Sequence, residues 1–153
     1  MMVFCKRAAV VLVLMCLAVG LRAFDVIYGS LFQLDGVSFK NGRPVLPLTR
    51  ARYANVRVLD KATFEWLKTC PAVCRQKDAR GNWQIVSFRA AKTRPDMWIA
   101  DVAIDEKWQL TFLIFKNKDG FSLVTPKEVT VLDAKWFAHI EKALQTRIME
   151  DKE

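Results

Sequence analysis

The chain is organised around a stretch that reads Val56-Arg57-Val58-Leu59-Asp60-Lys61-Ala62-Thr63-Phe64-Glu65-Trp66-Leu67. Much of it returns as Val129-Thr130-Val131-Leu132-Asp133-Ala134-Lys135-Trp136-Phe137-Ala138-His139-Ile140. Five of the twelve aligned positions are identical: the two valines and the Leu, Asp and Phe that follow them. Each copy predicts the end of a strand, an Asp N-cap and a helix that packs Phe and either Leu or Ile inward. We therefore expect both segments to adopt the same local structure.

The repeat extends upstream of both copies. Phe39-Lys40-Asn41-Gly42 precedes the first copy, and Phe115-Lys116-Asn117-Lys118-Asp119-Gly120 precedes the second. A short apolar stretch follows each of these turn sequences, so the shared plan is a hairpin, a strand, an Asp cap and a helix. Two explanations stay open: an internal duplication, and the convergent use of a common strand-to-helix junction.

Alternating apolar residues predict short strands over the remainder of the chain. We expect strands near residues 24–34, 45–48, 53–59, 83–91, 98–104, 108–114, 121–124 and 129–132. Residues 110–115 are mostly apolar on both alternating faces, interrupted only by Thr111, which predicts a central strand. Residues 71–82 show no periodicity and are expected to form a polar, basic connector.

These elements predict an α+β fold. We expect a curved antiparallel sheet of about seven or eight strands, with a C-terminal helix packed on it and a short helix near residues 61–70. The C-terminal helix is expected to run from Asp133 to about Met149. The alternative is a small closed barrel of the lipocalin kind with the last helix outside.

The N-terminal segment has the pattern of a signal peptide. Lys6 and Arg7 precede an apolar run over residues 8–21, which is shorter than the roughly 20 residues of a membrane-spanning helix. We expect residues 1–23 to be a signal peptide, cleaved after Ala23 or Gly20, and residues 24–153 to form a single α+β domain. The alternatives are an uncleaved anchor and lipidation of Cys16, either of which would hold the exported domain near a membrane. The expected location is the periplasm or the outside of the cell.

Charge is distributed unevenly along the chain, whose net charge is +8. Residues 40–94 hold thirteen basic and three acidic residues, whereas residues 95–153 hold eight basic and eleven acidic residues. This asymmetry predicts a polarised surface, with a basic binding patch in residues 43–94. The basic residues expected to form this patch are Arg50, Arg52, Arg75, Lys77, Arg80, Arg89, Lys92 and Arg94.

No stretch carries a recognisable catalytic or cofactor motif. The single histidine, His139, lies at the flank of the apolar stripe of the last helix, which favours a structural role. One histidine and no cluster of cysteines leave none of the usual zinc ligand sets. The carboxylates Asp96, Asp101, Asp105 and Glu106 are expected to be solvated charges at strand edges. We therefore expect no catalytic residue, no cofactor and no metal.

Cys70 and Cys74 are the cysteines that remain once the N-terminal segment is removed. In an oxidising compartment we expect them to form a disulfide that pins the end of the first helix. Their spacing is one residue longer than the Cys-x-x-Cys of thioredoxin-like redox proteins. Free or partner-paired thiols stay open, as does redox catalysis favoured by the basic neighbours Arg75, Lys77 and Arg80.

Three functional hypotheses follow. The first is a non-enzymatic, exported binding module of the cell envelope whose basic patch meets an acidic envelope surface or an acidic protein partner. The second is a carrier of small apolar ligands, with a pocket in a Trp-lined half-barrel, and the third is a thiol enzyme. Tyr53 and Trp83 are the only obvious stacking platforms near the patch, so nucleic acid is not an expected partner. The basic charges also fit a simpler role in keeping a Trp-rich domain soluble.

Overall fold

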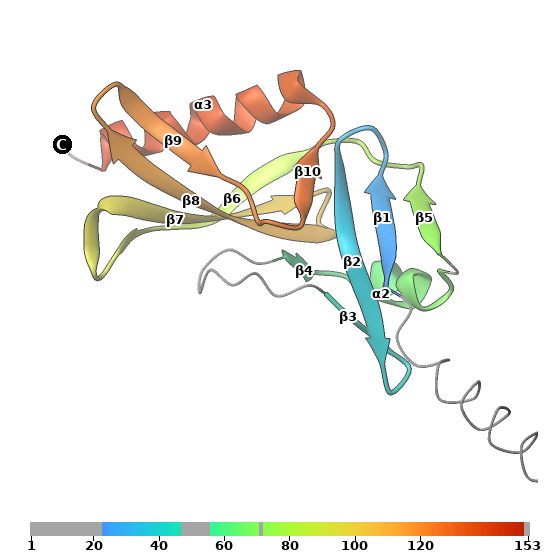
Figure 1. The fold of residues 1–153 in the computed structure, drawn as a ribbon. Helices are drawn as coiled ribbons and strands as arrows, with labels where there is room; N and C mark the ends of the chain where they lie inside the picture. Colours follow the sequence, from blue (N-terminus) through green and yellow to red (C-terminus); the bar gives the residue numbers. More distant parts are fainter. Residues whose placement is uncertain (1–22, 47–55, 71, 152–153) are drawn as a thin grey trace, which may run out of the picture.

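The computed structural model describes residues 23–46, 56–70 and 72–151. Over these residues the chain forms ten strands in two sheets, together with two helices (Figure 1). The first sheet contains β1 (Phe24–Tyr28), β2 (Phe32–Lys40), β3 (Arg43–Val45), β5 (Val73–Gln76) and β10 (Val129–Val131). The second contains β4 (Val56–Val58), β6 (Trp83–Ala91), β7 (Arg94–Ile104), β8 (Trp108–Asn117) and β9 (Gly120–Val124). The helices are α2 (Lys61–Lys68) and α3 (Ala134–Glu150).

The predicted α+β class is confirmed, and both predicted helices are present. The strands differ from the prediction because they divide between two sheets, ordered β10-β2-β1-β5 and β4-β8-β7-β6, with β3 on β2 and β9 on β8. Within the described ranges no strand pair joins the two sheets, so the closed-barrel alternative is not formed. Residues 1–22 of the predicted signal segment lie outside these ranges.

The connector prediction is wrong for β5, which lies within residues 71–82. This strand pairs with β1 in parallel, whereas the other strand pairs in the described chain are antiparallel. The sequence signal is weak because Cys74 alone is buried on β5, between the exposed Val73 and Arg75. One buried residue does not establish a period of two.

The two halves of the chain share a topology and exchange a strand. β1, β2, β3, β4 and α2 correspond in order to β7, β8, β9, β10 and α3. β4 pairs with β8 of the second half, and β10 pairs with β2 of the first half. The equivalent partners are Val56 with Leu110, Val58 with Trp108, Val129 with Leu34 and Val131 with Phe32.

Each exchanged strand ends at an Asp that caps a helix, as the repeat predicts. The Asp60 carboxylate accepts a hydrogen bond from the N–H of Thr63 at 3.2 Å, and the Asp133 carboxylate accepts one from the N–H of Trp136 at 3.0 Å. The expected likeness of the two segments is confirmed for the strand, the cap and the helix, but the predicted inward packing of the Phe is found for Phe137 and not for Phe64. Because the likeness also covers the β1–β2 and β7–β8 hairpins, it supports an internal duplication over convergence at one junction.

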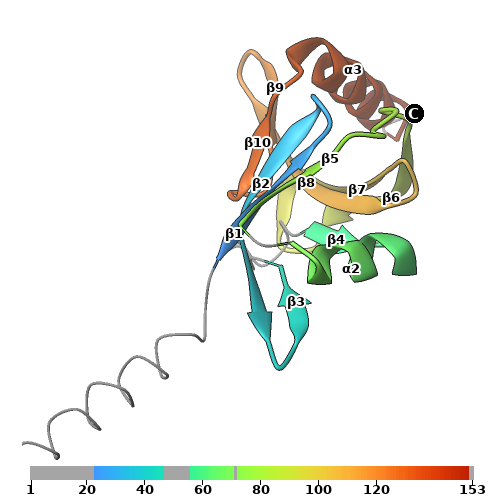
Figure 2. The ribbon, with the colours of Figure 1, turned by 90° about the vertical axis from the view of Figure 1, so that its right-hand side faces the viewer.

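One apolar core fills the space between the sheets. Trp108 is fully buried there, and its ring lies 6.2 Å from that of Tyr28 and 6.1 Å from that of Phe32. Helix α3 lies over the second sheet and contributes three fully buried residues, Ile140, Leu144 and Ile148 (Figures 1 and 2). The central position predicted for residues 110–115 is confirmed, because β8 is buried on both faces from Trp108 to Ile114. Neither of the two described helices is long and apolar enough to cross a membrane.

Replacing Asp133 with Ala is expected to lower the free energy of unfolding by about 1 kcal/mol, because the N–H of Trp136 loses its acceptor. Asp151→Ala removes the same charge from the other end of α3, where a negative charge is unfavourable to the helix dipole, so we expect no destabilisation. Urea unfolding followed by circular dichroism measures both. Equal destabilisation by the two substitutions would contradict the role of the cap.

Candidate functional site

The structure divides the predicted basic patch into two groups. One group precedes β6 and consists of Arg75, Lys77 and Arg80. The other lies at the far end of β6 and consists of Arg89, Lys92 and Arg94. A strand of this length spans roughly 25–30 Å, so the two groups do not form one patch (Figure 1). Arg50 and Arg52 lie outside the described residues.

Two arginines of the second group are engaged in local contacts. The guanidinium of Arg89 lies 3.1 Å from the Asp101 carboxylate, which also accepts hydrogen bonds from Ser87 and Thr111. The guanidinium of Arg94 lies 3.5 Å from the Asp96 carboxylate, and it also packs over the ring of Phe115. Asp101 is therefore part of a polar cluster on the sheet and not the solvated charge that the sequence suggests. These contacts give Arg89 and Arg94 structural roles.

The first group has a different environment. Arg75, Lys77 and Arg80, which we call the connector cations, are all exposed. In the described part of the chain their side chains form no ion pair. They lie on β5 and on the short segment that joins β5 to β6, between the two halves of the chain. Their charges are thus available to a partner.

A partly buried carboxylate fixes the backbone beneath the connector cations. Asp105, in the β7–β8 turn, accepts hydrogen bonds from the Tyr28 hydroxyl at 2.6 Å and from the N–H groups of Arg80, Gly81 and Asn82 at 2.8, 3.1 and 2.8 Å. Partial burial acts to raise the pKa of Asp105, but these four hydrogen bonds outweigh it and lower that pKa. Burial and the neighbouring Asp105 charge raise the pKa of Tyr28, which therefore stays a donor. Sequence reasoning missed this role, because Asp105 resembles an ordinary turn residue.

The same segment is held at both ends by equivalent turns of the two halves. The N–H of Gly29 in the β1–β2 turn donates to the carbonyl of Gln76 at 2.8 Å, and the N–H of Asp105 donates to the carbonyl of Asn82 at 2.8 Å. Gly29 has a φ of 55°, and a Cβ atom there would lie 2.5 Å from the Cβ of Ala79. The turn therefore requires glycine both for its conformation and for its close approach to the connector.

Two adjoining hollows flank this segment. One has a volume of about 450 Å³ and is lined in part by Arg80, Trp83 and Glu106. The other, of about 330 Å³, lies between α2 and the end of β5. Both are lined by Asp78 and Lys107, whose side chains form an ion pair at 2.9 Å. Most residues that line both hollows are polar or charged, with one Trp in each, whereas the pocket expected of an apolar-ligand carrier is lined mainly by Trp and other apolar residues.

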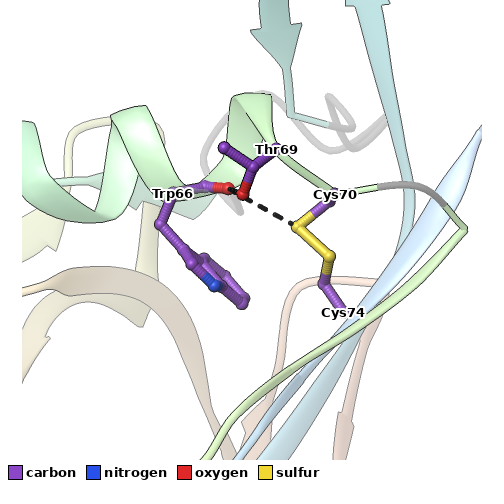
Figure 3. The surroundings of a disulfide bond; sticks show 4 residues. All are labelled: Trp66, Thr69, Cys70 and Cys74. Atoms are coloured by element: carbon purple, nitrogen blue, oxygen red, sulfur yellow. Dashed lines mark hydrogen bonds between the residues drawn. A yellow bond between two sulfur atoms is a disulfide. The ribbon is translucent and has the colours of Figure 1, made fainter.

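The predicted disulfide between Cys70 and Cys74 is confirmed. It joins the end of α2 to β5, with the Cys70 sulfur 3.7 Å from the carbonyl oxygen of Trp66 (Figure 3). Cys70 and Cys74 are only 8% and 7% exposed. Reactive cysteines are normally more accessible, so this burial favours a structural bond over a redox centre.

No family model, no curated protein and no solved structure matches this chain. His139 is exposed on α3. In the described ranges, His, Cys, Asp and Glu side chains form no group of three that could hold a metal ion. The connector and its two hollows are therefore the candidate site on geometry alone.

Replacing Asp105 with Asn is expected to make the free energy of unfolding depend less on pH in the acid range. The pKa of Asp105 is lowered on folding, so its contribution is complete above the ordinary value of 3.8 and is lost as the pH falls through the lowered value. Stability should thus fall less steeply below about pH 4 in the variant. Urea unfolding over a series of pH values measures this slope. Tyr28→Phe keeps the carboxylate and should retain part of the slope, whereas an unchanged slope in Asp105→Asn would show that the carboxylate does not clamp the connector.

Replacing both Cys70 and Cys74 with Ser is expected to lower the free energy of unfolding by about 2 kcal/mol, because the short loop loses its covalent closure. Thermal unfolding of the oxidised protein and of the double variant measures the difference. Reducing agent should destabilise the parent protein by a similar amount and leave the variant unchanged. Catalytic turnover in an insulin-reduction assay, lost in the variant, would instead establish the thiol-enzyme hypothesis.

Proposed function

We propose that this protein is an exported, non-enzymatic binding module of the cell envelope that holds an anionic partner through the connector cations. The observation that carries the proposal is the placement of three cations, which form no ion pair with any described residue, on a segment whose backbone is fixed by Asp105 and Gly29. Preorganised charges lose less conformational entropy on binding than charges on a mobile loop. The partner is an acidic envelope surface or an acidic protein.

The core offers no comparable support for the apolar-ligand carrier. Trp108 and Trp98 are buried in contact with other aromatic rings, so these side chains are part of a filled core. Trp83 and Trp66 line hollows whose other walls are mainly polar or charged. The disulfide is compatible with export, because such bonds persist in oxidising compartments.

Reversing the connector cations in a triple variant, Arg75→Glu, Lys77→Glu and Arg80→Glu, is expected to weaken anion binding at least about tenfold. The probes are vesicles of phosphatidylglycerol in phosphatidylcholine, followed by co-sedimentation, and fluorescent polyglutamate, followed by anisotropy. Binding of the parent protein should weaken as salt is raised, because exposed charges are screened.

The matched control carries the same change of net charge at the opposite end of the molecule. It combines Lys92→Glu, Lys116→Glu and Lys118→Glu, three exposed positions in or beside the β6–β7 and β8–β9 turns (Figure 1). It is expected to keep most of the binding. The proposal fails if neither probe binds the parent protein, or if both triple variants weaken binding equally.

A further inference from the structure

We propose that the free edge of β5 accepts an extended acidic segment of a partner protein as an added strand. This inference rests on the proposed function, because it assigns the connector cations a partner of stated chemistry. It adds a mode of recognition, in which main-chain hydrogen bonds supply affinity and alternate side chains supply specificity.

The ladder between β1 and β5 shows which main-chain groups of β5 are free. The carbonyls of Ala72 and Gln76 accept hydrogen bonds from the N–H groups of Asp25 and Gly29, at 3.2 and 2.8 Å. In a parallel ladder the groups that face a neighbouring strand belong to alternate residues. The main-chain groups of Val73 and Arg75 therefore face away from β1. Among the described strands β5 is the last of its sheet, and Figure 2 shows it facing outward.

The side chains along this edge define the sequence that would pair with it. Val73, Arg75 and Lys77 alternate along the chain and are all exposed, Val73 to 60%. Residues directly opposite one another on neighbouring strands share a face, and opposite charges there contribute roughly 0.2–1 kcal/mol. A complementary segment carries an apolar residue opposite Val73 and an acidic residue opposite each of the two cations.

The same charges argue against a second copy of this chain as the occupant. Pairing β5 with itself would bring Arg75 and Lys77 of the two copies close together, and like charges opposite one another are destabilising. Basic side chains on an edge strand are a common means of preventing such self-pairing. With an acidic strand the charges opposite Arg75 and Lys77 attract instead of repel. The edge therefore favours an acidic segment of a partner protein over a second copy of this chain.

The hollow between α2 and β5 supplies a second, independent observation. Thr63 is only 2% exposed, and its hydroxyl oxygen has no hydrogen-bond partner within the described chain. The same is true of the Gln76 amide oxygen and of one Asp60 carboxylate oxygen, and all three residues line this hollow. These acceptors are enclosed, so a bound segment that continues past Lys77 brings N–H donors to them only if the walls of the hollow move apart.

The test uses a fluorescent peptide in which Val and two Glu occupy alternate positions and Thr fills the rest. Two derivatives carry N-methyl groups on one or the other alternate set of backbone amides. Because strand addition uses only one of these sets, one derivative should bind at least about tenfold more weakly while the other keeps its affinity. Arg75→Glu with Lys77→Glu should also weaken binding, and a peptide with Lys in place of Glu should recover it.

Equal binding of both N-methylated derivatives would overturn strand addition. If the parent protein then still binds phosphatidylglycerol vesicles through the connector cations, the proposed function stands without this mode of recognition. If neither peptide nor vesicles bind, the proposed function fails as well. A β5-dependent dimer of the free protein, detected by light scattering, would instead assign the edge to a second copy. Unfolding of each protein variant, followed by circular dichroism, shows whether a loss of binding reflects a loss of fold.

Discussion

Neither half of this chain completes its own sheet, because β4 and β10 each pair with a strand of the other half. The exchange places Val56 and Val129 in one common core and fixes where both helices begin. A half that folded alone would expose the unpaired edge of β2 or β8 and the apolar face behind it. We therefore expect the described fold to form as one cooperative unit, with many contacts between residues distant in sequence.

The exchange also determines the position of the connector. Its ends are bonded to the β1–β2 turn of one half and the β7–β8 turn of the other, through Gly29 and Asp105. The indole N–H of Trp136, at the start of α3, donates to the carbonyl of Gly81 at 2.9 Å and adds a third attachment. A segment that elsewhere would be an ordinary surface loop is thus held in place by the fold itself. The backbone that carries these exposed cations is therefore fixed by hydrogen bonds to both halves, unlike the backbone of a hairpin tip.

The sequence predicted those features that depend on local chemistry. The repeated Val-x-Val-Leu-Asp segment predicted both capped corners, and the apolar residues of 110–115 predicted the central strand. The division into two sheets was not predictable from these signals, because periodicity shows which face of a strand is buried and not which strand lies beside it. The hydrogen bonds from the backbone of residues 80–82 to the Asp105 carboxylate were missed for a similar reason. Asp105 and Arg80 are 25 residues apart in sequence, and their contact exists only once β6 has paired with β7.

The difference between the halves locates the candidate site more sharply than their likeness. β1 and β7 are equivalent strands, yet their outer edges have different partners. β7 pairs with the nine-residue β6, whereas β1 pairs with the four-residue β5. A long antiparallel partner such as β6 is formed by a hairpin and needs no further support. A strand as short as β5 requires additional attachment, which the disulfide to α2 and the bond from Gly29 to Gln76 provide. These two attachments hold β5 in place, and among the described strands its outer edge has no partner, beside three cations that form no ion pair in the same part of the chain.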